Sequence, residues 1–344
     1  MTPRIWSIAA LGLAVLGGTT LHTDYSASRS VHYEAFMELN SETTRMERDG
    51  QPVEMPGGAG TSGQEREVAW TDKVLEHKDG KPVRVERTFG DVKQTSTMNF
   101  GGEEQSREQK GALDGVKLEL KRGEEGKIEV EVKDGDAPGE SLEGHKLELL
   151  LDAFLPEGEV ADGDEWTVEA DAIRHGLGLD LSMALFPPQP EPERGGGGSG
   201  GEGRRGPRGP RGGGASTLFA QAALEGKCKL KEGTEDVEGV ACRVITITIE
   251  ADGELEEPSF GGGSGGRGRA FGMPSASLVE TNYEIKLEGK LLFDAKSKLP
   301  VSLELEGTTK VDSNREFEGR DGTMMKFGST QEGQVKFTAT VSVE

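Results

Sequence analysis

Residues 300–306 read Pro-Val-Ser-Leu-Glu-Leu-Glu, and this short run predicts the fold class. After the proline, apolar side chains occupy every second position, and serine or glutamate occupies each position between them. Because successive side chains of a β-strand point to opposite faces, such a strand has one apolar face and one solvated face. This pattern is typical of an antiparallel sheet that buries one of its faces.

The same pattern extends over residues 223–311, which we interpret as an antiparallel meander. Residues 226–232 and 239–251 form one predicted hairpin, and residues 279–293 and 300–311 form another. Pro300 lies at the beginning of its strand, where the sheet needs no backbone N–H.

Further strands are predicted on both sides of this meander. The alternation predicts them at residues 31–39, 43–55, 67–76, 83–89, 115–121, 127–133, 164–168 and 334–343. The segment 43–55 turns back on itself at Asp49-Gly50, and Asp79-Gly80 joins the next two strands. Both dipeptides favour two-residue hairpin turns.

Two segments between these strands have helical periodicity instead. Apolar residues between Leu147 and Phe154 fall at helical spacing, and Pro156 follows the expected end. Residues 172–186 form a second, poorer helix because they contain glycines. We therefore predict a mainly β fold, a curved antiparallel meander sheet with one or two helices covering its open face. A two-sheet sandwich is the alternative.

Composition limits both the core and the partners. The chain has 344 residues, of which 33% are hydrophobic and 52 are glycine, so its core is smaller than its length suggests. The formal net charge is −22, which argues against nucleic acid as a partner of the folded body. We expect one antiparallel β domain over residues 21–344.

Residues 1–20 have the organisation of a secretory signal peptide. Arg4 precedes an apolar run at residues 5–16, and small residues follow the run. The run is too short to span a bilayer comfortably, which favours a cleaved signal over the alternative, a retained anchor. We expect export to the periplasm or the extracellular space, with no transmembrane span in the mature chain.

Residues 194–214 and 261–272 are rich in glycine and arginine and are predicted to be disordered loop insertions within the one domain. Their arginines resemble those of segments that contact polyanions through charge and stacking. The alternative is a solvated surface loop, since aromatic residues are almost absent from both stretches. The candidate polyanion-contacting residues are Arg204, Arg205, Arg208, Arg211, Arg267 and Arg269.

Cys228 and Cys242 are the two cysteines of the chain, and they lie in the two strands of one predicted hairpin. A turn centred on Glu235 would place them directly opposite each other, within disulfide reach. Because an oxidising compartment favours the bond, we predict a structural disulfide between them. The alternative is a pair of reduced thiols in the core.

No local pattern for catalysis, cofactor binding or metal binding is found in the sequence. The five histidines are scattered singly, without the spacing of a local metal site. There is no GxSxG motif, and the glycine-rich runs lack the lysine of a phosphate-binding loop. We expect a protein that is not an enzyme and has no cofactor. A zinc site assembled from distant residues and a hydrolase with an unrecognised site are the alternatives.

Two segments resemble a known group of proteins. Leu155-Pro156 followed by Gly163-Asp164-Glu165-Trp166, and the segment GKLLFDAKSKLPVSL at residues 289–303, resemble uncharacterised exported bacterial β proteins. That group is similar in architecture to the lipoprotein-carrier superfamily, a curved antiparallel half-barrel with helices across its concave side. The matching motifs are structural turns, so the resemblance implies a fold and an export route but no site residue.

Two functions are compatible with these patterns. The first is a non-catalytic exported protein that binds a lipid-like or other hydrophobic small molecule, or an exported protein segment, on the concave apolar face of its sheet. The second is a structural or adhesive protein of the cell envelope that acts through the glycine- and arginine-rich loops.

Overall fold

The computed structural model describes residues 18–25, 29–53, 60–100, 102–187, 215–256, 277–318 and 323–343. Its strands are β1 (Thr19–Thr20), β2 (Ser30–Arg48), β3 (Gln51–Pro52), β4 (Thr61–Lys78), β5 (Lys81–Phe100), β6 (Glu103–Lys110), β7 (Lys117–Arg122), β8 (Ile128–Asp134), β9 (Glu159–Val160), β10 (Glu165–Val168), β11 (Glu225–Val237), β12 (Val240–Glu256), β13 (Ser277–Asp294), β14 (Leu299–Glu318) and β15 (Met324–Val343). Its helices are α1 (Ala170–Gly176), α2 (Ser182–Leu185) and α3 (Ala215–Gln221), and its 3-10 turns are η1 (Glu124–Gly126), η2 (Gly139–Leu142) and η3 (Leu150–Phe154).

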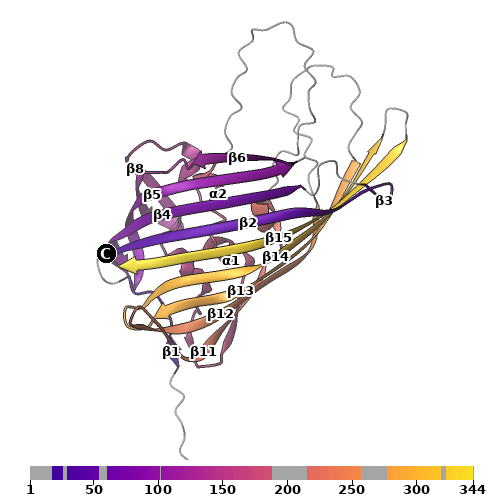
Figure 1. Ribbon diagram of the computed structural model, residues 1–344. Helices are drawn as coiled ribbons and strands as arrows, with labels where there is room; N and C mark the ends of the chain where they lie inside the picture. Colours follow the sequence, from indigo (N-terminus) through magenta and orange to yellow (C-terminus); the bar gives the residue numbers. More distant parts are fainter. Residues whose placement is uncertain are drawn as a thin grey trace, which may run out of the picture.

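Within these described residues, thirteen strands form one antiparallel sheet (Figure 1). The main path runs β10-β11-β12-β13-β14-β15-β2-β4-β5-β7-β8, so most neighbours in the chain are also neighbours in the sheet. The exception is β15, which pairs with β2 over most of its length and thereby joins the two halves of the meander. The path ends at β10 and β8 and does not close on itself. The single curved sheet predicted from the sequence is confirmed, and the two-sheet sandwich is not observed.

The predicted hairpin turns of the N-terminal half are confirmed, and the strands are longer than predicted. Asp49 and Gly50 have φ of 53° and 75°, and Asp79 and Gly80 have φ of 52° and 75°. Positive φ at both central residues is the geometry of the tight turns that such dipeptides favour. The predicted strand 31–39 and the first part of the segment 43–55 form one strand, because β2 continues without a break from Ser30 to Arg48. Beyond the turn, Gln51 and Pro52 of β3 pair with the end of β2.

Short helices cover one face of the sheet, as predicted (Figure 1). The expected helix at residues 172–186 is divided into α1 and α2, and Gly178 between them has φ of 64°. The expected helix ending at Phe154 is the 3-10 turn η3. A Cβ on Gly176 would lie 2.4 Å from the Phe154 ring, so this glycine allows α1 to pack directly on η3.

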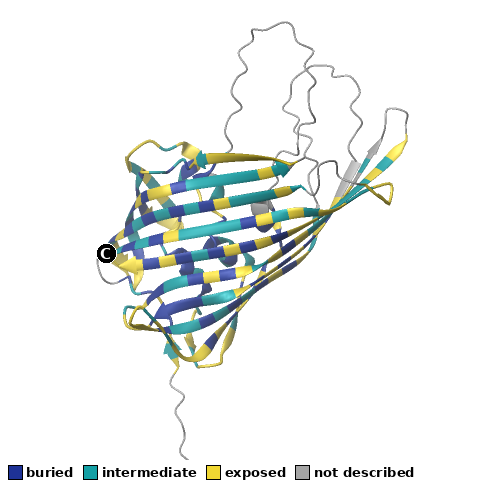
Figure 2. Ribbon diagram, in the orientation of Figure 1, coloured by how far each residue is buried: buried dark blue, intermediate teal, exposed yellow. Residues whose placement is uncertain are grey.

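The core occupies only one part of the sheet. Buried apolar side chains from the strands and from the helical segments form one cluster beneath α1, α2 and η3. Figure 2 shows that burial is concentrated in the half of the sheet near these helices, while the narrow twisted end is mostly exposed. The polar residues that extend the strands contribute to the small hydrophobic share of the chain.

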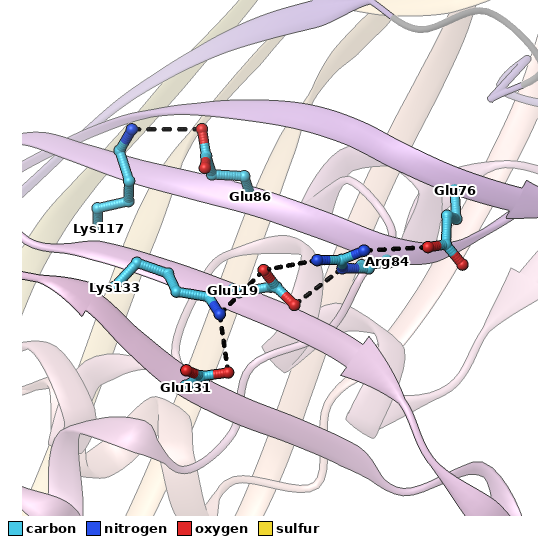
Figure 3. Close-up of polar contacts among 7 residues, drawn as sticks. All are labelled: Glu76, Arg84, Glu86, Lys117, Glu119, Glu131 and Lys133. Carbon is cyan, nitrogen blue, oxygen red and sulfur yellow. Dashed lines mark hydrogen bonds and ion pairs between the residues drawn. The ribbon is translucent and has the colours of Figure 1, made fainter.

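The outer face of the sheet is solvated and carries ion pairs between strands (Figure 3). Arg84 on β5 donates two hydrogen bonds to Glu119 on β7, at 2.8 and 3.0 Å, and one to Glu76 on β4 at 3.0 Å. Lys133 on β8 lies 3.2 Å from Glu119 and 2.8 Å from Glu131. These pairs tie the edge strands to the sheet and explain why charged residues alternate with apolar ones there.

The N-terminal segment packs against the body. Thr19 and Thr20 of β1 pair with Val160 and Glu159 of β9, and Leu21 is fully buried. The last residues of the predicted signal peptide therefore contact the domain, whereas residues 1–17 lie outside the described residues. The loops 194–214 and 261–272, with their six candidate arginines, also lie outside them. Within the described residues, no helix is long and apolar enough to cross a membrane.

A buried carboxyl group anchors this N-terminal segment. The hydroxyl groups of Thr23 and Tyr25 both donate hydrogen bonds to the carboxylate of Asp152 on η3. The Leu149 N–H in turn donates to the Tyr25 hydroxyl oxygen at 2.7 Å. Burial raises the pKa of Asp152 to about 6, above the usual value of an aspartate. The segment is therefore attached through a group that titrates near neutral pH.

We predict that Asp152→Asn changes the pH dependence of stability. Because folding raises the pKa of Asp152, its contribution to stability is fully present below about pH 4 and is lost as the pH rises through about 6. Asparagine resembles the neutral acid, so the variant should match the wild type near pH 4 and melt at a higher temperature near pH 7. Thermal unfolding followed by circular dichroism measures this, and a difference that is constant across this range contradicts it.

Two glycines allow unusually close approach of paired backbones in the C-terminal half of the sheet. A Cβ on Gly289 of β13 would lie 1.8 Å from the Glu304 carbonyl oxygen, and one on Gly307 of β14 would lie 1.9 Å from the Lys286 carbonyl oxygen. Real Cβ atoms do not approach other atoms so closely, and the obstacle is backbone rather than a flexible side chain.

We predict that Gly307→Ala destabilises the fold, because the added methyl group forces the β13 backbone to move. Overpacking of this kind costs about 1–3 kcal/mol. Gly90→Ala on β5 is the matched control, since a Cβ there makes only an ordinary contact with Ala69 at 3.7 Å. Urea unfolding of the two variants measures the difference, and equal stabilities contradict the prediction.

Candidate ligand-binding site

A small apolar cavity lies between the sheet and the helices that cover it. Its volume is about 30 Å³. The sheet side is formed by β2, β4 and β15, and the helical side by η3, α2 and the segment between α1 and α2. The lining residues are Tyr33, Ala35, Met37, Arg66, Val68, Trp70, Leu150, Leu177, Gly178, Leu181, Leu185 and Phe337.

The alternation of side chains along β2 and its register with β4 determine which residues line the cavity on the sheet side. Tyr33, Ala35 and Met37 follow one another at every second position of β2, so all three point to the same face. Their partners in the antiparallel register of β4 are Trp70, Val68 and Arg66, in that order. The six residues therefore form three cross-strand pairs, and Arg66 is the charged member of an otherwise apolar and aromatic wall.

Arg66 is buried, with 8% of its surface exposed, and it contacts the covering helix α2. Its Nη1 donates to the Ser182 hydroxyl oxygen at 2.6 Å, and its Nη2 donates to the Gln94 amide oxygen at 3.1 Å. Its guanidinium lies 5.1 Å from the centre of the Phe186 ring. Burial lowers the pKa of Arg66 to about 10, so the group is still charged at neutral pH.

An aromatic stack supports the wall beside Arg66. The rings of Tyr33 and Trp70 stack with their centres 4.3 Å apart, and Phe89 packs on Trp70 at 5.8 Å. The Tyr33 hydroxyl group is buried and has no hydrogen-bond partner among the described residues. Burial raises the pKa of Tyr33, which therefore stays neutral.

A buried ion pair lies next to this stack. Arg87 on β5 and Asp72 on β4 are directly opposite in the register. The Nε and Nη2 atoms of Arg87 donate to the two carboxylate oxygens of Asp72, each at 2.7 Å. Trp70 Nε1 donates to the same carboxylate at 3.3 Å, and the Arg87 guanidinium lies 4.8 Å from the Trp70 ring centre. The pair thus positions one wall of the cavity.

The nearby histidines are structural. His145 donates from Nε2 to the Ser141 carbonyl oxygen, 3.0 Å away, and packs its ring on Phe89. Burial, assisted by the charge of Arg87, lowers the pKa of His145 to about 4, so it is neutral at pH 7. His175 contacts Asp180 at 2.8 Å. In the part of the chain that the structure describes, no three metal-ligating side chains lie close enough together to hold a metal ion.

The predicted disulfide between Cys228 and Cys242 is wrong, since both cysteines are free. In the register of β11 and β12, Cys228 is opposite Ile247, and Cys242 is opposite Glu235. Cys228 belongs to the core, whereas strand alternation from Ile245 places Cys242 on the other face of the sheet. Burial raises the pKa of Cys228 to about 12, so its thiol is unreactive.

The position of the turn explains this error. The chain reverses at Glu238 and Gly239, which have φ of 51° and 86°, and not at Glu235. The register also shifts between Leu230 and Thr234, where Gly233 has φ of 81°. The turn, nearer the C-terminal end than Glu235, moves the two cysteines apart, and the bulge in β11 shifts the partner of Cys228 by two residues without restoring the pairing.

A larger hollow of about 860 Å³ lies where the strands leave the core, and it is much more polar. Hydroxyl, amide and charged side chains line it, among them Asn40, Thr61, Thr97, Glu284 and Glu332. Its carboxylates outnumber its lysines, and no large apolar side chain lines it. This hollow offers no wall for a hydrophobic molecule, so the apolar cavity is the candidate site for the class of ligand predicted from the sequence.

The sequence analysis did not identify Arg66, Asp72 or Arg87 as site residues. The signal was present, because each of them occupies an inward position in the alternation of its strand. In β4 these inward positions are the even-numbered ones, which include Val68, Trp70 and Val74. A charged residue in such a series is buried and therefore needs a partner.

Comparisons with known proteins do not assign the chain to a family. No protein-family model matches the sequence, and no curated protein matches it. Among solved structures, "Lipid-protein interactions in lipovitellin" is similar over 89% of this chain, with 8% sequence identity and a TM-score of 0.30. The match covers 25% of the lipovitellin chain, so the present chain spans a quarter of that length. A similarity at this level assigns neither a function nor a site residue.

We predict that Asp72→Asn strongly destabilises the protein, because it leaves the charge of Arg87 buried without its partner. Breaking a buried pair in this way costs about 3–5 kcal/mol. Asp91→Asn on the exposed face of β5 is the control and should change stability by less than about 0.5 kcal/mol. The double variant Asp72→Leu/Arg87→Met should recover much of the loss in urea unfolding. A single variant as stable as the control contradicts the prediction.

Proposed function

We propose that this protein is an exported, non-catalytic β protein that binds a lipid-like hydrophobic ligand between its sheet and its covering helices. The observation that carries the proposal is the apolar cavity lined by the three cross-strand pairs of β2 and β4 and by leucines of η3, α2 and the segment before α2. Apolar walls with few polar groups are characteristic of sites for hydrophobic molecules.

The size of the cavity implies that the helices move when a ligand binds. Small-molecule sites have volumes of about 300–1,000 Å³, and a cavity of about 30 Å³ holds no lipid chain. The cover can move without breaking the sheet, because α1 has 7 residues, α2 has 4, and neither belongs to a strand ladder. Arg66 links the sheet to α2 through its hydrogen bond to Ser182, and the Ala112 N–H donates to the Leu185 carbonyl oxygen at 2.8 Å.

The apolar surface that is exposed when α2 moves favours an apolar ligand. If α2 moves away from the sheet, Leu181 and Leu185 separate from Val68 and Phe337 on the other side of the cavity, and that apolar surface meets water. Exposed apolar surface costs about 25 cal/mol for each Å². A hydrocarbon chain that fills the gap removes this cost, whereas a polar ligand does not. The covering helices thus favour hydrophobic molecules.

Trp70 provides a direct test, because it lines the cavity and contacts its neighbours closely. The chain has 3 tryptophans, so the variant Trp6→Phe/Trp166→Phe has Trp70 as its only tryptophan. A brominated fatty acid, 9,10-dibromostearate, should quench Trp70 in a saturable manner, and excess oleate should reverse the quenching.

A pair of neighbouring substitutions separates cavity binding from surface adsorption. Ala35→Phe fills the cavity and should abolish the quenching, while Glu34→Phe places the same ring on the other face of β2 and should not. Circular dichroism confirms that both variants are folded. The proposal fails if Trp70 is not quenched, or if both variants bind equally well.

A further inference from the structure

Arg66 is a buried cation without an acidic partner among the described residues. Its hydrogen-bond acceptors are the neutral oxygens of Ser182 and Gln94, and its Nε has no acceptor although it is buried. A buried charge is normally paired, because removal from water costs far more than neutral acceptors restore. Within the described part of the chain, the wall of the apolar cavity therefore carries a positive charge that no carboxylate compensates.

Arg87, the other buried arginine on this face of the sheet, shows which group binds to the guanidinium edge formed by Nε and Nη2. Arg87 presents Nε and Nη2 to the two oxygens of Asp72, at 2.7 Å each. In Arg66 the equivalent edge consists of the unpaired Nε and of Nη2, which donates to the Gln94 amide at 3.1 Å. A carboxylate can occupy this edge by accepting from Nε and displacing one neutral amide oxygen at Nη2.

We infer that the ligand is a single-chain amphiphile with a carboxylate headgroup, such as a long-chain fatty acid, and that Arg66 binds this headgroup through Nε and Nη2. This inference rests on the proposed function, and it adds the chemical class of the ligand and the residue that selects it. The hydrocarbon chain lies along the apolar wall of Val68, Trp70 and Phe337, and the Nη1 bond to Ser182 is not displaced.

The alternative role for Arg66 is structural, as a link between the sheet and α2. The two roles predict different effects of the headgroup on binding. A structural arginine affects oleate and oleyl alcohol equally, since these molecules share one chain and differ only in the polar end. A headgroup-binding arginine affects the carboxylate alone, because charge-assisted hydrogen bonds are about twice as strong as neutral ones.

The experiment compares the affinities of oleate, oleyl alcohol and acetate for the whole protein, each as a competitor of the Trp70 quenching by dibromostearate. For the wild-type protein, oleate should bind about tenfold or more tightly than oleyl alcohol, the ratio expected of hydrogen bonds to a charged group. Acetate, which has the headgroup without the chain, should not compete at the same concentrations.

Substitutions test whether Arg66 causes the preference for oleate over oleyl alcohol. Arg66→Gln removes the charge and should reduce the preference for oleate to less than about threefold, while Arg84→Gln on the solvated face should leave it unchanged. Gln94→Leu removes the acceptor that the carboxylate displaces, so it should increase oleate affinity by about threefold. If Arg66 has only a structural role, Gln94→Leu should not increase the affinity for oleate. Arg66→Lys keeps the positive charge but loses the two parallel donors, so it should retain part of the preference for oleate. This variant replaces Arg66→Gln in the test if Arg66→Gln does not fold.

Each outcome is decisive. Equal affinity of the wild-type protein for oleate and oleyl alcohol overturns the inference and leaves the proposed function intact. A preference for oleate that survives in Arg66→Gln also overturns it. Competition by acetate as strong as that by oleate overturns the requirement for a chain. If neither oleate nor oleyl alcohol competes, the proposed function fails together with the inference.

Discussion

The rest of the inner face depends on the ion pair between Arg87 and Asp72. Both groups are almost fully buried, so each would be strongly destabilising alone, and the two are compatible with the core only when β4 and β5 are in exact register. The pair also fixes Trp70 through a hydrogen bond and a ring contact, and Trp70 holds Tyr33 by stacking. Arg87 further donates to the Lys146 carbonyl oxygen at 3.3 Å, which connects the sheet to the segment that precedes η3.

Periodicity predicted most of the sheet because each strand buries one face. The strands proposed around the meander of residues 223–311 are present, except that the segments 31–39 and 43–55 share the continuous strand β2. The turns at Asp49-Gly50 and Asp79-Gly80 have the expected positive φ. The same alternation contained the candidate site, since Arg66 and Asp72 stand at inward positions of β4. These residues were overlooked because a chain with 30% charged residues makes a single charge unremarkable until the face it occupies is known.

Other features depend on interactions that a local pattern does not contain. The cysteine pairing was inferred from symmetry about a turn at Glu235, but the chain turns at Glu238 and Gly239. Even-numbered residues of β11 therefore pair with odd-numbered residues of β12, and Cys228 and Cys242 lie on opposite faces of the sheet. The long polar ends of β2 and β15 have no regular apolar side to mark them, so strand pairing, of β15 with β2 and with β14, defines where they end. Residues 172–186 divide into two helices at Gly178, which has φ of 64°, and Gly176 allows α1 to pack on Phe154.

The pairing of β15 with β2 has a consequence for how the fold is completed. These strands lie in the middle of the sheet path, yet they come from opposite ends of the described chain. Until β15 is in place, the meander consists of two separate halves, each with a long unpaired strand edge that invites pairing with another chain. Contacts between residues so distant in sequence form slowly. The sheet therefore becomes continuous only when its final strand arrives, and an incomplete chain is the form most exposed to aggregation.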